Sequence, residues 1–256
     1  MDTRWSSNFG DTEWWQVKFA EPRVIAGLKI SWETAFAEKY EVAVSMDGQQ
    51  WQKVYSVPEG DGRTDILFFK PVETRYLRIQ CLQRGTGWGN SIYEIAFYDG
   101  DRAPKVTATS STDGAGPELA LDGDPSTMWR SAVAGEQMLT VQLPETLSLG
   151  GLEILWGDPA TRYDVECSAD GASWTKMFEE KNGNGAKDYI FFPATDARHM
   201  RVICREGPAN GYAIKEMEFK SGEEQASPIR AYQAKARDAA RGRYLMWLTR
   251  EQEFWT

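Results

Sequence analysis

The sequence contains one pattern twice, and this repeat limits the folds that the chain can adopt. Trp5 and Trp129 lie 124 residues apart in similar surroundings, and Trp51 and Trp174 lie 123 residues apart. The matched segments are Leu28–Trp32 with Leu152–Trp156, Ser45–Trp51 with Ser168–Trp174, and Arg75–Cys81 with Arg198–Cys204. Such a constant offset indicates two copies of one domain. Because the period exceeds the roughly 20–50 residues of solenoid repeats, each copy can bury its own core.

We expect copy one at residues 1–100 and copy two at residues 101–222. Both copies consist of short segments in which apolar and polar residues alternate, as in Trp15–Phe19 and Leu139–Leu143. This period of two is typical of half-buried strands. Asp-Gly pairs stand between several of these segments, where glycine allows a tight turn. The pattern predicts an all-β fold of two tandem β-sandwiches.

Residues 223–256 have a different character. Ser227 and Pro228 suit the cap and first turn of a helix, and apolar residues then recur at helical spacing. We expect a helix here that links to, or begins, a downstream domain.

Composition and charge exclude several classes of function. The formal net charge is −9, and acidic residues outnumber basic ones in both copies. This balance argues against nucleic acid as a partner and makes an anionic membrane surface a poor one. No apolar run approaches the roughly 20 residues of a membrane span, and no signal peptide opens the chain.

The residues that commonly carry catalysis are scarce. The single histidine, His199, falls on a predicted strand, and no nucleophile elbow, P-loop or metalloprotease motif is present. Cys81, Cys167 and Cys204 fall on predicted strands and suit buried core positions. A Cys167–Cys204 disulfide remains an alternative, so the cysteines leave the compartment open. We therefore expect this chain not to be an enzyme, although a parent protein could be a glycoside hydrolase.

Several motifs in a fixed order resemble the discoidin family, which includes coagulation factor V/VIII type C domains and family 32 carbohydrate-binding modules. They are the run Leu119–Trp129, the Ser-x-Asp-Gly-x-x-Trp turn, the Arg-x-x-Arg strand and the closing segment Ile214–Glu218. The resemblance implies a jelly-roll sandwich of about eight strands whose loops at one end bind a ligand. Copy one lacks a counterpart of the first strand and of the Asp-Gly-Asp segment, so we expect it to be N-terminally truncated.

The Asp122-Gly123-Asp124 turn is a candidate metal site in copy two. Oxygen ligands crowded into a tight turn suit Ca²⁺. By resemblance, the ligands would be the Asp122 carboxylate, the Thr127 hydroxyl, Glu216, and backbone carbonyls near Leu119 and Asp124. Such an ion would be structural, and the alternative is a solvated turn without metal. In copy one only Thr3 and Glu94 correspond, and we expect no site there.

Loops at one end of each copy supply candidate ligand contacts. An aromatic ring can stack on the apolar face of a sugar while a cation and an amide bridge its hydroxyl groups. Copy one offers Phe36, Arg63, Trp88 and Asn90 for these roles, and Trp88 stands among glycines on an exposed loop. The corresponding candidates in copy two are Arg162, Asn184 and Tyr212.

The interpretation that best fits these features is a non-catalytic carbohydrate-binding tandem. It would be an accessory region of a larger bacterial glycan-processing enzyme, with a glycan or polysaccharide and a downstream catalytic domain as partners. The resemblance implies a secreted, periplasmic or cell-surface location. Two alternatives remain: a protein- or lipid-binding adhesion module, and a structural spacer.

Overall fold

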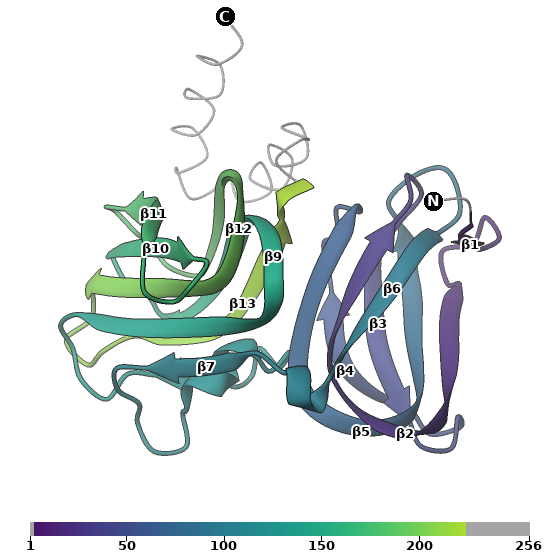
Figure 1. The fold of residues 1–256 in the computed structure, drawn as a ribbon, viewed down its shortest axis with the longest axis horizontal. Coiled ribbons are helices and arrows are strands. Elements are labelled where there is room, and N and C mark those ends of the chain that lie inside the picture. Colours follow the sequence, from purple (N-terminus) through teal and green to yellow (C-terminus); the bar gives the residue numbers. More distant parts are fainter. Residues whose placement is uncertain (1–2, 224–256) are drawn as a thin grey trace, which may run out of the picture.

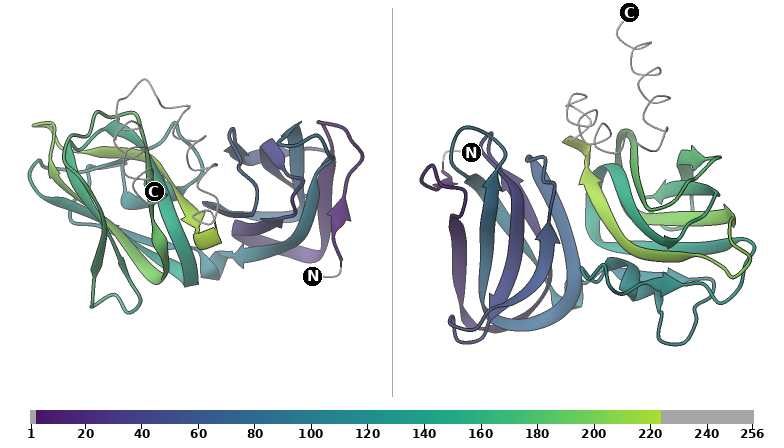
Figure 2. Two further views of the ribbon diagram at one scale, coloured as in Figure 1. Left: turned by 90° about the horizontal axis from the view of Figure 1, so that it is seen from above. Right: turned by 180° about the vertical axis from the view of Figure 1, so that it is seen from behind.

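The structure, a computed structural model, describes residues 3–223 and consists of two β-rich bodies that lie side by side (Figures 1 and 2). The all-β prediction is confirmed, because strands account for most of the described chain. The predicted C-terminal helix falls on residues outside the described range.

Copy one contains six strands that pair in antiparallel fashion throughout. They are β1 (Trp5–Ser6), β2 (Trp14–Trp32), β3 (Ala37–Ser45), β4 (Gln52–Val57), β5 (Thr64–Arg84) and β6 (Ser91–Asp99). The strand order is β1-β6-β2-β5-β3-β4. Apolar residues alternate toward a core that includes Leu28, Ile30, Tyr40, Val42 and Leu77.

Copy two repeats this arrangement after a one-turn connector, η1 (Gly100–Arg102). Its elements are β7 (Lys105–Ala108), η2 (Pro117–Leu121), β8 (Trp129–Arg130), β9 (Gln137–Asp158), β10 (Arg162–Ser168), β11 (Thr175–Glu180), β12 (Lys187–Glu206) and β13 (Ala213–Ser221). The order β8-β13-β9-β12-β10-β11 matches that of copy one, strand for strand.

The two copies differ at one sheet edge. In copy two, β7 pairs with β9 from Lys105↔Gln142 to Ala108↔Leu139 and covers that edge. In copy one the equivalent part of β2, Trp15–Lys18, pairs with β5 alone within the described residues. Within the described residues, copy one therefore has an open edge where copy two has its first strand.

A buried hydrogen-bond cluster recurs at the same place in each copy. In copy one, Asp65 Oδ2 accepts hydrogen bonds from Trp32 Nε1 at 2.6 Å and from the Tyr40 hydroxyl at 2.5 Å. The corresponding residues of copy two, Trp156, Tyr163 and Asp188, make the same contacts at 2.9 Å and 2.5 Å. Each cluster ties three strands together beneath the loops.

The three cysteines are free thiols in the core, as expected from their strand positions. Burial raises the pKa of Cys81 and of Cys167 to about 12, so both remain protonated near neutral pH. The alternative of a Cys167–Cys204 disulfide is therefore wrong.

The two copies lie side by side (Figure 1), and strand pairing and aromatic contacts join them at a junction. β13 pairs with β5 through Phe219↔Ile66 and Lys220↔Asp65, which joins the copies by backbone hydrogen bonds. Phe68 of copy one contacts the Phe219 ring edge to face, with ring centroids 6.0 Å apart, and lies 5.2 Å from the Tyr98 ring. Ile66, Phe68 and Tyr98 belong to the same hydrophobic core cluster as copy two, so this part of the junction is apolar.

Candidate functional site

Three loops of copy one gather at one end of its sandwich, and hydrogen bonds between them fix their positions. Ser7 and Asn90 exchange two such bonds: the Ser7 N–H donates to the Asn90 carbonyl, and the Asn90 N–H donates to the Ser7 hydroxyl, each at 2.8 Å. The Gly85 N–H donates to the Phe36 carbonyl at 2.9 Å. The loops before β2, before β3 and before β6 are thereby held as one surface.

Two aromatic rings protrude from this surface. Phe9 is 69% exposed and Trp88 is 66% exposed, the two highest values among the large hydrophobic residues. Their ring centroids lie 6.2 Å apart with an interplanar angle of 52°. Neighbouring exposed rings form an apolar surface patch, and such patches mark candidate binding sites. The pair is the strongest ligand-binding feature of the loop end.

Arg84 supports this pair from below. Its Nε donates to Asp11 Oδ1 at 2.8 Å, and its Nη1 donates to the Trp88 carbonyl at 3.4 Å. The hydrogen bonds from Arg84 lower the pKa of Asp11, which keeps this carboxylate charged. One guanidinium thus connects the loop that carries Phe9 with the loop that carries Trp88.

The other candidates of copy one occupy different positions from those expected. Phe36 is 6% exposed and packs in the core, so its ring offers no face to a ligand. Asn90 is 1% exposed and holds two loops together through its backbone. Arg63 adopts a left-handed backbone, with φ of 63°, and its Nη1 donates to the carbonyl of Glu223, the residue that follows copy two, at 3.2 Å. Of the four candidates, only Trp88 is strongly exposed at the loop end.

Copy two carries no aromatic ring at the corresponding places. Val133 stands where copy one has Phe9, and Asn210 stands where it has Trp88, both exposed. Tyr212 corresponds to Asn90, is 1% exposed and packs in the core, so the expected aromatic platform of copy two is not at the surface. Arg162 is paired with Glu206 at 2.7 Å, and Asn184 is exposed.

Phe9 was missed by sequence reasoning because its loop precedes the first long strand and was not counted among the ligand loops. A comparison of the two copies could have found it. At the two loop positions where copy one has Phe9 and Trp88, copy two has Val133 and Asn210. The shared fold therefore does not require an aromatic ring at either position.

The Asp-Gly-Asp turn of copy two brings the predicted metal-ligating atoms together. The Thr127 hydroxyl lies 2.9 Å from Asp122 Oδ2, 3.0 Å from the Asp124 carbonyl and 3.5 Å from the Leu119 carbonyl. Glu216 reaches the same turn from β13, where its Oε2 accepts a hydrogen bond from the Gly123 N–H at 3.0 Å. All five predicted residues therefore meet within one small region.

One oxygen of the Glu216 carboxyl, Oε1, is buried without a hydrogen-bond partner among the described residues. Burial and the neighbouring Asp122 carboxylate raise the pKa of Glu216 well above its usual value. An oxygen-rich site with two close carboxylates and an unpartnered buried oxygen fits a hard cation such as Ca²⁺.

This site differs from common metal centres in its ligand types. Within residues 3–223 there is no group of three or more His, Cys, Asp or Glu that could hold a metal ion; the candidate set consists of two carboxylates, one hydroxyl and two carbonyls. The corresponding residues of copy one, Thr3 and Glu94, are both exposed.

The sequence profile of the F5/8 type C domain matches residues 1–95 and again residues 105–217. The chain belongs to the F5/8 type C family. The predicted discoidin resemblance is thereby confirmed for both copies, and the domains are of a binding type.

Individual relatives match parts of this F5/8 type C chain. The polysaccharide lyase 8 family protein HylA of Enterococcus faecalis is 34% identical over 87 residues, which are 33% of this chain and 6% of that protein. Chitosan-binding module 2 of a Paenibacillus sp. IK-5 chitosanase/glucanase, solved with chitotriose, is 32% identical. The match covers 46% of this chain and 95% of that one, with a TM-score of 0.44. The family 32 module of Clostridium perfringens NanJ, solved with galactose, is 21% identical over 45% of this chain and 92% of its own, with a TM-score of 0.42.

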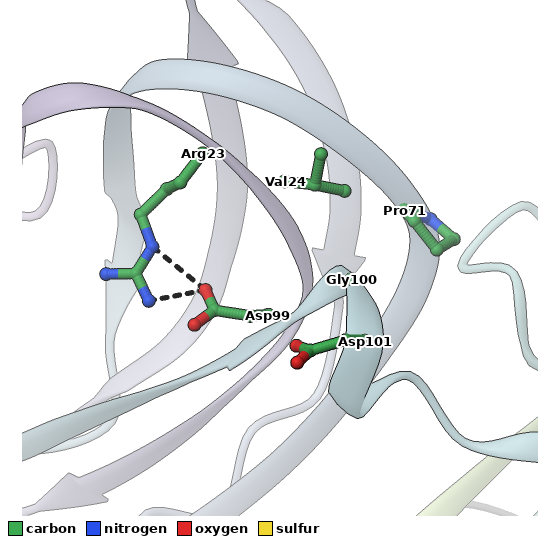
Figure 3. A pocket seen from close by; sticks show the side chains of 6 residues that line it. All are labelled: Arg23, Val24, Pro71, Asp99, Gly100 and Asp101. Carbon is green, nitrogen blue, oxygen red and sulfur yellow. Dashed lines mark hydrogen bonds and ion pairs between the residues drawn. The ribbon is translucent and has the colours of Figure 1, made fainter.

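Two further hollows on the surface of this F5/8 type C chain contain charged side chains that already form ion pairs. The hollow beside the connector is lined by Arg23, Val24, Pro71, Asp99, Gly100 and Asp101 (Figure 3). There Arg23 donates to Asp99 at 2.9 Å and lies over the Phe19 ring, so its charge is already engaged. A second hollow, on copy two, includes Glu166 and Arg201, which pair with each other at 2.5 Å.

The part of the chain that the structure describes contains no helix with the length and apolar character of a membrane span.

Proposed function

We propose that copy one binds a glycan at the Phe9–Trp88 pair. The observation that carries this proposal is the protrusion of two rings from tethered loops at the end of the sandwich. Aromatic rings bind the C–H face of a sugar ring, and the backbone amides and polar side chains of the same loops can satisfy its hydroxyl groups. Membership in a family of binding domains supports the same conclusion.

The loops need little reorganisation before binding. The Ser7–Asn90 bonds and the Arg84–Asp11 ion pair hold the backbone on both sides of the rings. Ordering a flexible loop costs about 0.5–1.5 kcal/mol for each immobilised side chain, and prior ordering avoids part of this cost. A weak, rigid site of this type suits repeated contacts with a polymer.

The features of copy two support a different role for this domain, that of a spacer. Val133 and Asn210 replace the two rings, while β13 and Phe219 attach this copy to copy one. We assign glycan contact to copy one, and positioning to copy two. Arg162 and Asn184 of copy two are exposed and stay our candidates for a weak polar contact.

In this proposal Ca²⁺ has a structural role in copy two. The Asp122 carboxylate, the Thr127 hydroxyl, the Glu216 carboxylate and the carbonyls of Leu119 and Asp124 would hold it. The ion would supply the positive charge that two adjacent carboxylates need, and would tie η2 to β13.

We further propose that the chain is a non-catalytic accessory region of a larger secreted or cell-surface glycan-processing enzyme, with its catalytic domain elsewhere in the parent protein. The polysaccharide lyase 8 relative supports this, since the matched stretch is only 6% of that protein. Avidity for a polymeric glycan would then concentrate the catalytic domain on its substrate.

The test is a glycan-array screen followed by affinity electrophoresis in gels that contain the polysaccharides identified. Phe9→Ala with Trp88→Ala should reduce retention at least tenfold without a change in melting temperature. Trp14→Ala is the matched control, because Trp14 is also exposed but stacks with Arg78 on a sheet face. Val133→Ala tests the equivalent position of copy two. Equal retention of wild type and the double variant would refute the assignment of the site.

A further inference from the structure

The turn that carries the predicted calcium ligands is also part of the junction between the copies. The Lys70 N–H of copy one donates to the Asp122 carbonyl at 2.9 Å. Gly123 has a φ of +79°, and a Cβ atom there would lie 2.9 Å from copy one. The copy-one atoms at that distance are Phe69 Cβ, Tyr55 Cδ2 and the Val54 carbonyl oxygen. The turn therefore packs so closely on copy one that only glycine fits at this position.

A single peptide unit connects the two functions of the turn. The carbonyl of the Asp122–Gly123 peptide accepts the bond from Lys70 in copy one, while its N–H donates to Glu216 Oε2 at 3.0 Å. The Asp122 side chain lies on the calcium-ligating side and accepts the Thr127 hydroxyl. A movement of either carboxylate thus displaces the peptide that copy one contacts.

A cation bound at this turn would relieve two electrostatic penalties. Glu216 Oε1 is buried without a hydrogen-bond partner among the described residues, and the Asp122 carboxylate lies close by. Two carboxylates in a poorly solvated site repel each other, and an unpartnered buried oxygen is costly. A cation that both carboxylates ligate removes both penalties, whereas without it the turn gains free energy by moving apart.

We propose that Ca²⁺ in copy two acts as a clamp between the copies, because the turn that holds the ion is the surface on which copy one packs. This inference rests on the calcium site proposed above. The ion fixes the Asp122–Gly123 peptide and with it the contact to Lys70, Tyr55 and Phe69. Its removal loosens this side of the junction, while the β5–β13 pairing and the Phe68–Phe219 contact keep the copies attached.

Interdomain distance measurements test the clamp. Gln49 and Ala172 are exposed and occupy equivalent turns of the two copies, and the native cysteines are buried, so Gln49→Cys and Ala172→Cys can carry spin labels. In the doubly labelled chain, pulsed electron–electron double resonance measures the distance between the two spin labels. The distribution of this distance should be narrow with Ca²⁺ and broader after chelation with EDTA. Isothermal titration calorimetry on the same protein reports whether Ca²⁺ binds.

The outcomes separate the two proposals. Binding of Ca²⁺ with an unchanged distance distribution would overturn the clamp and leave the calcium site intact. Absence of binding on folded protein would overturn both. Glu216→Gln should abolish binding and give the broad distribution under both conditions, and Glu94→Gln, at the exposed equivalent position of copy one, should change neither.

Linkage supplies an independent test from the other side of the junction. Coupling between two contacts is reciprocal. If Ca²⁺ binding strengthens the contact between the copies by some factor, then loss of that contact must lower the Ca²⁺ affinity of copy two by the same factor. Lys70→Pro removes the N–H that the Asp122 carbonyl accepts, although Lys70 touches no ligand atom of the site. We expect its calcium affinity to fall about fivefold or more. An unchanged affinity in a folded Lys70→Pro variant would contradict the coupling.

Discussion

At the scale of single residues, the buried Trp–Tyr–Asp clusters are the most informative feature. Trp32 and Tyr40 donate to Asp65, yet burial and the nearby Asp61 raise the pKa of Asp65 from its usual value of 3.8 to about 7. Between these two pH values the unfolded chain has released a proton that the folded protein keeps. The free energy of unfolding therefore decreases as the pH rises from about 4 to about 7.

Asp65→Asn should remove this pH dependence while keeping the two hydrogen bonds, because the amide oxygen of Asn can accept both. The stability of wild type relative to the variant should fall by up to about 4 kcal/mol over this range, at roughly 1.4 kcal/mol for each pKa unit. Urea unfolding at several pH values measures the difference. Asp61→Asn should lower the pKa of Asp65, so the decrease in stability should end at a lower pH. If the free energy of unfolding had the same pH dependence in wild type and in Asp65→Asn, the raised pKa of Asp65 would be contradicted.

The sequence predicted the candidate site only in part, and the reason lies in single residues. Trp88 was recognised because glycines around it indicated an exposed loop, and its exposure agrees with that expectation. Phe36 and Tyr212 lie in loops but point into the core, since the loops fold back over the end of the sandwich. Loop position alone does not reveal which way a ring points, whereas strand alternation does.

At the scale of elements, the strands and their recurrence in two copies followed from the sequence, because period-two alternation and the constant repeat offset are strong signals. The order of the strands in the sheets came from the structure alone. The internal repeat also provides a control that single-domain proteins lack. β7 covers the edge of β9 in copy two, while the equivalent edge of β2 in copy one has no partner within the described residues. An uncovered edge leaves every second backbone amide without a protein hydrogen bond.

Hydrogen exchange should show this difference directly. Within Trp15–Lys18, the amides that point away from β5 should exchange about tenfold or more faster than their counterparts in residues 139–142, which β7 protects. Amide exchange followed by NMR resolves alternate residues of both strands in one sample. Amides of Trp15–Lys18 that point toward β5 serve as the internal control. Equal protection of the outward amides in both copies would mean that another segment or a second molecule covers the edge of β2.

At the scale of the whole molecule, the junction makes two homologous domains into one unit. Ile66, Phe68 and Tyr98 of copy one are part of the core of copy two, and the two sheets are joined by β5–β13 pairing. The sequence indicated two domains but not this joint, because the interface residues lie on strands whose alternation is equally consistent with a solvent-facing side. Because the two copies are joined in this way, the loop end of copy one has a fixed direction relative to copy two.

This arrangement predicts cooperative unfolding. In differential scanning calorimetry the two copies should unfold in a single transition, since neither can open without exposing the apolar junction. Phe68→Ala removes the ring that packs on Phe219, and it should cost about 3–5 kcal/mol. Because much of this cost falls on the junction, the variant should show two transitions, one for each copy.

A matched variant separates coupling from general destabilisation. Phe97 neighbours Tyr98 on β6 but packs on Phe19 within copy one, with ring centroids 5.3 Å apart. Phe97→Ala should lower the melting temperature while the transition stays single. Two transitions in both variants would show that any loss of stability in copy one uncouples the pair, and two transitions in wild type would show that the junction is too weak to couple the copies. A single transition in wild type and in Phe97→Ala, with two in Phe68→Ala, would attribute the coupling to the Phe68–Phe219 contact itself.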